Sequence, residues 1–120
     1  MKGARIVYAA SSIALALLEL RVHWVPSKGR ALCLYRIELS NKLVSFLEVD
    51  QLPKDWRAHP PSRSTMRIGI DWIKSRSSVG LVVPNAIVPE EVNCLLNPMH
   101  PRFGHVKVEG PFTYRLDSRL

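Results

Sequence analysis

One stretch, YAASSIALALLELRVHW from Tyr8 to Trp24, constrains this fold most because it is dense in small and aliphatic residues. A helix built from it is apolar almost all round, which predicts a helix buried at the centre of a domain. The stretch nevertheless carries one carboxylate, Glu19, in its middle. Burying an ionised carboxylate costs on the order of several kcal/mol unless the group is paired, hydrogen-bonded or open to a cleft. The sequence therefore predicts either a structural partner for Glu19, such as a core arginine, or a ligand site around it.

Spacing places two other polar side chains near Glu19. His23 follows it by four residues, so a helix carries the carboxylate and the imidazole on one face, one turn apart. Tyr8 lies just before the turn that starts this helix. Both also have an ordinary structural interpretation, since His23 can be a packing histidine and Tyr8 a core residue of an apolar strand.

Length and charge limit what such a site can bind. The chain has 120 residues, 47% of them hydrophobic, which fits one domain with a real core. Its net charge of +7 favours an anionic partner such as a nucleotide, a nucleic acid or an acidic protein. The basic residues are scattered, so direct nucleic-acid binding has only weak support. Cys33 and Cys94 lie among apolar neighbours, which predicts buried thiols in a reducing, cytoplasmic environment. No residues have metal-ligand spacing, so no metal site is expected.

The N-terminal residues also imitate a secretory signal, with a basic start followed by an apolar run. Ser11 and Ser12 interrupt that run, which favours a folded segment over a signal. The run is also too short to span a bilayer, so no membrane partner is expected.

Apolar runs between turn residues predict several short strands. They are expected at residues 5–9, 31–39, 43–49, 79–83, 105–108 and 112–116. The first of these reads as a buried strand. The alternation at residues 31–39 places Ala31, Cys33, Tyr35, Ile37 and Leu39 on one face.

Helical periodicity and capping residues predict two helices. One is expected from Ser11 or Ser12 to about Trp24, and the other from Ser62 or Ser64 to residues 75–78. A polar turn is expected at 27–30. The proline-rich segment 50–61 is expected to be a surface loop that Trp56 pins. Strands and helices that do not alternate regularly predict a compact α+β domain with a mixed or antiparallel sheet.

Several short motifs follow one another along the chain. They are Val7-Tyr8-Ala9-Ala10-Ser11-Ser12 followed by Ala14-Leu15-Ala16-Leu17-Leu18-Glu19, Leu52-Pro53-Lys54-Asp55-Trp56, Arg67-Ile68-Gly69 with Trp72, Val82-Val83-Pro84-Asn85, and Asn93 to Pro98 with His100-Pro101. Taken in this order, the motifs resemble RES domains, the toxin component of bacterial toxin–antitoxin pairs. The resemblance covers essentially the whole chain, residues 1–120, as a single domain.

This resemblance implies a fold similar to that of bacterial ADP-ribosyltransferase toxins and an enzyme that degrades NAD. NAD is then the substrate, with no prosthetic group, and an Xre-type helix-turn-helix antitoxin is the expected partner. Glu19 matches the family's glutamate and Tyr8 a tyrosine of its pocket, while Asn85 stands where the family has a serine. The family's arginine is expected roughly ten residues before Tyr8, so the chain is expected to lack the family's N-terminal segment.

Cleavage between ribose and nicotinamide gives each candidate residue a chemical role. Positive charge develops on the sugar, and a carboxylate such as Glu19 stabilises it. Tyr8 can stack on nicotinamide, and His23 can hold Glu19 or a ribose hydroxyl. Asn85 can donate and accept hydrogen bonds at the position of the serine. Tyr8, Glu19 and Asn85 are thus the catalytic candidates, and Tyr8, His23 and Asn85 the NAD-binding candidates.

Two other functions and one structural interpretation stay open at this point. The chain can be a shortened, inactive relative that only binds an antitoxin, as Asn85 and the expected loss of the arginine indicate. It can also be a small basic nucleic-acid-binding protein, whose binding would weaken steeply with salt. Asn85 itself can be no more than a turn residue, because asparagine forms local hydrogen bonds there.

Overall fold

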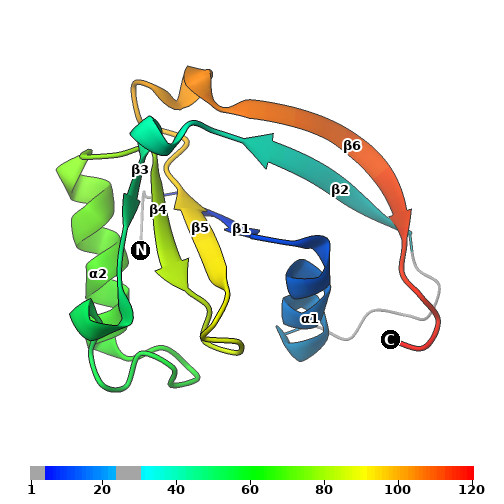
Figure 1. The fold of residues 1–120 in the computed structure, drawn as a ribbon, viewed down its shortest axis with the longest axis horizontal. Coiled ribbons are helices and arrows are strands. Elements are labelled where there is room, and N and C mark those ends of the chain that lie inside the picture. Colours follow the sequence, from blue (N-terminus) through cyan, green and yellow to red (C-terminus); the bar gives the residue numbers. More distant parts are fainter. Residues whose placement is uncertain (1–4, 24–30) are drawn as a thin grey trace.

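A four-stranded sheet forms the centre of the computed structural model, which describes residues 5–23 and 31–120 (Figure 1). The strand order is β1 (Val7–Ala10), β5 (Val92–Leu96), β4 (Gly80–Pro84) and β3 (Val44–Phe46). β3 and β4 run parallel, whereas the other neighbours are antiparallel. The sheet is therefore mixed, as the sequence predicts.

Helix α2 (Arg63–Ser75) covers one face of this sheet and builds the core with it. Ser62 caps the helix, since its hydroxyl oxygen accepts a hydrogen bond from the Thr65 N–H at 3.2 Å. On the inner face, Trp72 packs with Leu81 of β4 and Leu95 of β5. This amphipathic helix confirms the helix predicted to begin after Ser62.

A separate two-stranded ribbon of β2 (Ala31–Glu38) and β6 (Lys107–Arg115) arches beside the sheet, and helix α1 (Ile13–His23) lies beneath it in this view (Figure 1). Short 3-10 turns at Asn41–Leu43, Val49–Gln51 and Phe103–His105 join the larger elements. Strands and helices do not alternate regularly, so the α+β class is confirmed.

Helix α1 is less buried than the sequence predicts. Leu15 is buried, but Ile13, Leu18 and Val22 are 45%, 38% and 56% exposed. The helix packs beside β1 at the sheet edge instead of beneath the sheet, which leaves part of its apolar surface uncovered. Its start agrees with the prediction, because the Ser12 hydroxyl oxygen accepts from the Leu15 N–H at 3.0 Å. Its expected last residue, at position 24, and the polar turn at 27–30 lie outside the described residues.

Strand β1 is an edge strand and not the buried strand that the sequence predicts. Within the described residues its paired neighbour is β5. Val7 is 40% exposed and Tyr8 is 71% exposed. The edge position thus leaves Tyr8 a surface aromatic, contrary to the alternative interpretation of Tyr8 as a core residue.

A β-bulge in the ribbon reverses the predicted faces of the segment 31–39. The register with β6 shifts between Leu34 and Arg36. Gly110 and Pro111 of β6 stand opposite the single residue Tyr35 of β2, and inward and outward positions are exchanged beyond this irregularity. Tyr35 and Cys33 are exposed, whereas Leu32 and Leu34 are half-buried. The single face predicted from strict alternation is wrong for this reason.

The C-terminal strands also differ from the prediction. One long strand, β6, replaces the two strands expected at 105–108 and 112–116. Gly110 joins the two halves at φ 119°, a conformation that favours glycine. Strand β5 was not predicted, although the apolar run after Val92 ends at Asn97-Pro98 and has the pattern of a buried strand.

The two cysteines differ in environment. Cys33 is exposed, so its predicted burial is wrong, and Cys94 is half-buried on β5. Burial raises the pKa of the Cys94 thiol, although a hydrogen bond from the Leu81 backbone opposes the shift. The half-buried thiol is therefore held in its neutral form. Among the described helices, none is long and apolar enough to cross a membrane.

Candidate active-site cleft

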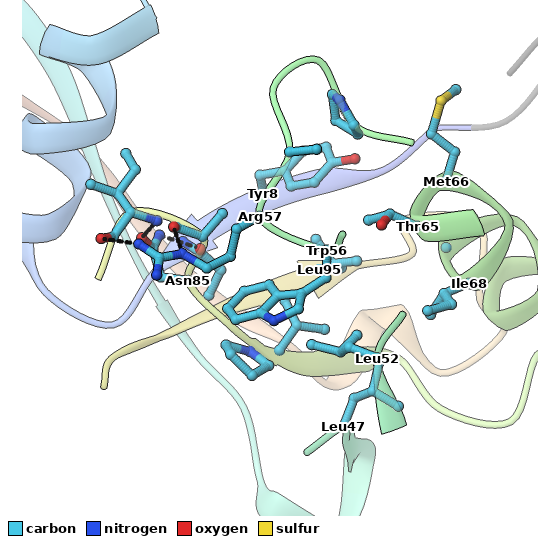
Figure 2. Close-up of a pocket in the computed structure, with 18 of the residues that line it drawn as sticks. Tyr8, Leu47, Leu52, Trp56, Arg57, Thr65, Met66, Ile68, Asn85 and Leu95 are labelled. Atoms are coloured by element: carbon cyan, nitrogen blue, oxygen red, sulfur yellow. Dashed lines mark hydrogen bonds between the residues drawn. The ribbon is translucent and has the colours of Figure 1, made fainter. Parts of the chain in front are cut away.

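A cleft of about 680 Å³ lies over the central sheet, between α2, the end of α1 and the loop that precedes α2. Its size falls within the range of small-molecule sites. All four residues singled out in the sequence line it: Tyr8, Glu19, His23 and Asn85. Figure 2 shows Asn85 and Arg57 at one end of the cleft, with Met66 and Ile68 of α2 at the other. Folding thus brings Asn85 to the residues of segment 8–23 and collects one predicted site from two distant parts of the chain.

Glu19 is held by an amide and opens onto the cleft. Its Oε1 accepts a hydrogen bond from Nδ2 of Asn93 at 2.8 Å. The same Nδ2 lies 3.3 Å from the backbone oxygen of Ala9, so Asn93 also ties α1 to β1. Glu19 is half-buried and lines the cavity. Of the two alternatives for Glu19, the geometry supports the ligand site over a sealed pair with a core arginine.

Asn85 orients the side-chain amide of Asn93 through a hydrogen bond to its oxygen. Asn85 is only 2% exposed, and its Nδ2 donates to Oδ1 of Asn93 at 2.6 Å. Its own Oδ1 accepts from the N–H groups of Ile87 and Val88, both at 2.8 Å. Asn85 is therefore a turn residue, as the structural interpretation predicts. Its side chain also connects this turn to Glu19 through hydrogen bonds to and from Asn93. This arrangement gives Asn85 a positioning role and leaves its predicted catalytic role without direct support.

Asn93 was not among the predicted site residues, because its signal in the sequence is weak. Asn93 is one polar residue in the apolar run of β5, which was not predicted as a strand. It lies opposite Ala10 in the pairing of β1 with β5, and it reaches Glu19 across 74 positions of the chain. Sequence spacing alone cannot reveal a contact of this length.

Aromatic and imidazole rings lie around the carboxylate. Tyr8 is 71% exposed, so its ring can receive a flat ligand. The rings of His23 on α1 and His59 on the loop lie with centroids 5.4 Å apart and are tilted by 51°. Both imidazoles line the cleft, so the sequence found one member of the pair and missed the other.

The loop before α2 supplies a further wall of the cleft. Trp56 is half-buried and lines the cavity, which agrees with its predicted role in pinning the loop. The adjacent Arg57 was not singled out in the sequence. Its Nε donates to the backbone oxygen of Ala86 at 2.8 Å, and its Nη2 lies 3.5 Å from that of Ile87. Arg57 thus joins this loop to the turn that Asn85 organises.

No group of three or more potential metal ligands occurs among residues 5–23 and 31–120. The chemistry of the described cleft instead rests on one carboxylate, amides, imidazoles, aromatic rings and a guanidinium. This set suits binding of a flat molecule that carries polar and charged groups.

Comparison with known proteins adds a family match. A family model described as the RES domain matches residues 2–117. A protein named Toxin Res from Yersinia enterocolitica is 39% identical over 121 residues, which cover 99% of this chain and 80% of that protein. Another Toxin Res, from Photorhabdus laumondii, is 40% identical over 98% of this chain and 77% of its own length. A protein named Prs ADP-ribosylating toxin, from Sphingobium, is 40% identical over 98% of this chain and 76% of its own length.

Proposed function

Because the chain belongs to the RES domain family, we propose that it is a toxin that cleaves the bond between nicotinamide and ribose in NAD. The observation that carries this proposal is the half-buried carboxylate of Glu19, held by Asn93 at 2.8 Å and open to a cleft of about 680 Å³. The name of the Sphingobium relative, an ADP-ribosylating toxin, supports the same substrate class.

The reaction requires the protein mainly to position the substrate and to stabilise the positive charge that develops on it. As the glycosidic bond breaks, its electron pair moves to the nicotinamide nitrogen, and positive charge develops on the ribose. The carboxylate of Glu19 stabilises that charge and can hold a ribose hydroxyl. Water, phosphate or a protein side chain then attacks the ribose carbon and releases its proton. With water, the products are nicotinamide, ADP-ribose and a proton.

The remaining cleft residues have roles that agree with this chemistry. Tyr8 offers an exposed aromatic ring for nicotinamide. His23 lies one helical turn after Glu19 and can bind the ribose. Asn85 holds Asn93 in place and so fixes the direction of the carboxylate.

We further propose where in the cell the toxin acts and which kind of protein inhibits it. A toxin that consumes NAD acts in the cytoplasm and must be held inactive by its own cell, here by an Xre-type helix-turn-helix antitoxin. The exposed apolar side chains Leu18 and Val22, one turn apart on α1, offer a surface at the rim of the cleft for such a partner.

The direct test is incubation of the purified chain with NAD, followed by chromatography of the products. Release of nicotinamide is expected, and the partner product identifies the acceptor as water, phosphate or protein. Binding of NAD without release of nicotinamide would contradict the proposed function and would favour a chain that only binds an antitoxin.

Asn93→Ala tests whether the amide positions the carboxylate. The variant is expected to lower kcat for nicotinamide release by about 10- to 100-fold with a smaller change in KM, because Glu19 loses its fixed direction. Asn97→Ala is the control, since Asn97 is a buried asparagine that directly follows the strand containing Asn93 but lies outside the cleft lining. An equal loss of kcat in both variants, measured below their melting temperatures, would reduce Asn93 to a structural residue.

A further inference from the structure

We propose that Arg57 anchors the diphosphate of the dinucleotide substrate in this cleft. The inference rests on the proposed function, because it names the part of the substrate that this residue binds. Among the described residues that line the cleft, Arg57 is the only arginine or lysine. A diphosphate carries its negative charge at two adjacent phosphates, and a planar guanidinium matches their oxygen atoms better than an ammonium group does.

The guanidinium is held in place before any ligand binds. Nε and Nη2 of Arg57 face the backbone oxygens of Ala86 and Ile87 at 2.8 and 3.5 Å. A guanidinium carries more N–H donors than two carbonyl oxygens use, and Arg57 is exposed, so further donors can reach a ligand. A side chain fixed in this way loses less conformational entropy when it binds an anion.

A continuous set of hydrogen bonds also connects Arg57 with Glu19. The carbonyls that hold Arg57 belong to the turn that Asn85 organises through the N–H groups of Ile87 and Val88. Asn85 in turn donates to Asn93, which donates to Glu19. The cation and the carboxylate are therefore fixed relative to one another. Because these hydrogen bonds fix the two side chains, a diphosphate bound to Arg57 determines where the ribose lies relative to Glu19.

The alternative is that Arg57 only fastens the loop before α2 to the turn after β4. Both roles predict that loss of the side chain harms the protein, but they differ in what is lost. A fastening residue affects the stability of the loop and every ligand of the cleft alike. A diphosphate anchor affects ligands that carry the diphosphate and leaves the others nearly unchanged.

The test is calorimetric titration of Arg57→Gln with two probes, ADP-ribose and nicotinamide riboside, with melting temperatures recorded alongside. Affinity for ADP-ribose is expected to fall by about 10- to 100-fold, the effect of one charge-assisted contact, while affinity for nicotinamide riboside stays nearly unchanged. Arg63→Gln serves as the control, since Arg63 is an exposed arginine on α2 outside the cleft lining. Its affinity for ADP-ribose should change by less than about twofold.

Each other outcome has a defined meaning. Unchanged affinity of Arg57→Gln for ADP-ribose overturns the inference, and so does an equal loss for nicotinamide riboside together with a lowered melting temperature. If the unsubstituted chain fails to bind ADP-ribose, the inference also falls. If it binds ADP-ribose through Arg57 but releases no nicotinamide from NAD, the diphosphate site stands and the proposed cleavage fails.

Discussion

Replacement of Glu19 by glutamine is expected to lower kcat for nicotinamide release by about 100- to 1000-fold. Glutamine keeps the length of the side chain and an oxygen that can accept from Asn93, but it removes the negative charge. The charge matters most in the transition state, where the ribose becomes positive, so KM should change much less than kcat. Initial rates measured by chromatography of nicotinamide give both constants.

Glu90→Gln is the matched control for that experiment. Glu90 is exposed in the turn between β4 and β5 and lies outside the cleft lining. Its removal changes the net charge of the protein by the same amount as the Glu19 variant and should leave kcat within about twofold. A Glu19→Gln variant with the rate of this control would show that the carboxylate does not act in the reaction.

Replacement of Trp72 by alanine is expected to lower the free energy of unfolding by about 3–5 kcal/mol. Trp72 is only 7% exposed and packs between Leu81 and Leu95. Its Nε1 donates to the Ser78 hydroxyl at 2.9 Å, and that hydroxyl in turn donates to the backbone oxygen of Gly80. Since a small domain has a total stability of only about 5–15 kcal/mol, the variant should be close to unfolding at 25 °C. Urea denaturation followed by circular dichroism measures the difference.

Two further variants separate packing from hydrogen bonding at this position. Trp72→Phe keeps an aromatic ring but loses the hydrogen bond to Ser78, so it should cost about 1–3 kcal/mol. Lys74→Ala, at an exposed position of the same helix, should change stability by less than about 0.5 kcal/mol. A Trp72→Ala variant as stable as the Lys74→Ala variant would contradict the core described here.

Local features of the chain were predictable because they depend on neighbouring residues. Ser12 and Ser62 were identified as possible helix caps, and in the structure both hydroxyl oxygens accept hydrogen bonds from the backbone three residues later. The periodicity of α2 and the apolar run of β4 predicted their positions to within a few residues. The α+β class followed from the order of these elements.

Exposure was the main property that local patterns did not predict. The apolar run from Ile13 to Val22 indicates a helix correctly, but its composition cannot show that the helix packs at a sheet edge. The same edge position leaves Tyr8 exposed. The exposed face of β2 changes between Leu34 and Arg36, where β6 contributes one extra residue to the pairing, and such an irregularity depends on the partner strand as much as on the sequence of β2.

The candidate site also has features that the sequence determines and others that only the tertiary structure decides. The sequence by itself determined that Glu19 is an acidic group in apolar surroundings, that His23 lies one turn after it, and that Tyr8 precedes the helix. Only the tertiary structure decided that Asn93 holds the carboxylate and that Arg57 lies in the same cleft. The physical reason is the range of the interactions: helix periodicity acts over a few residues, whereas these contacts form only after sheet pairing has brought distant segments together.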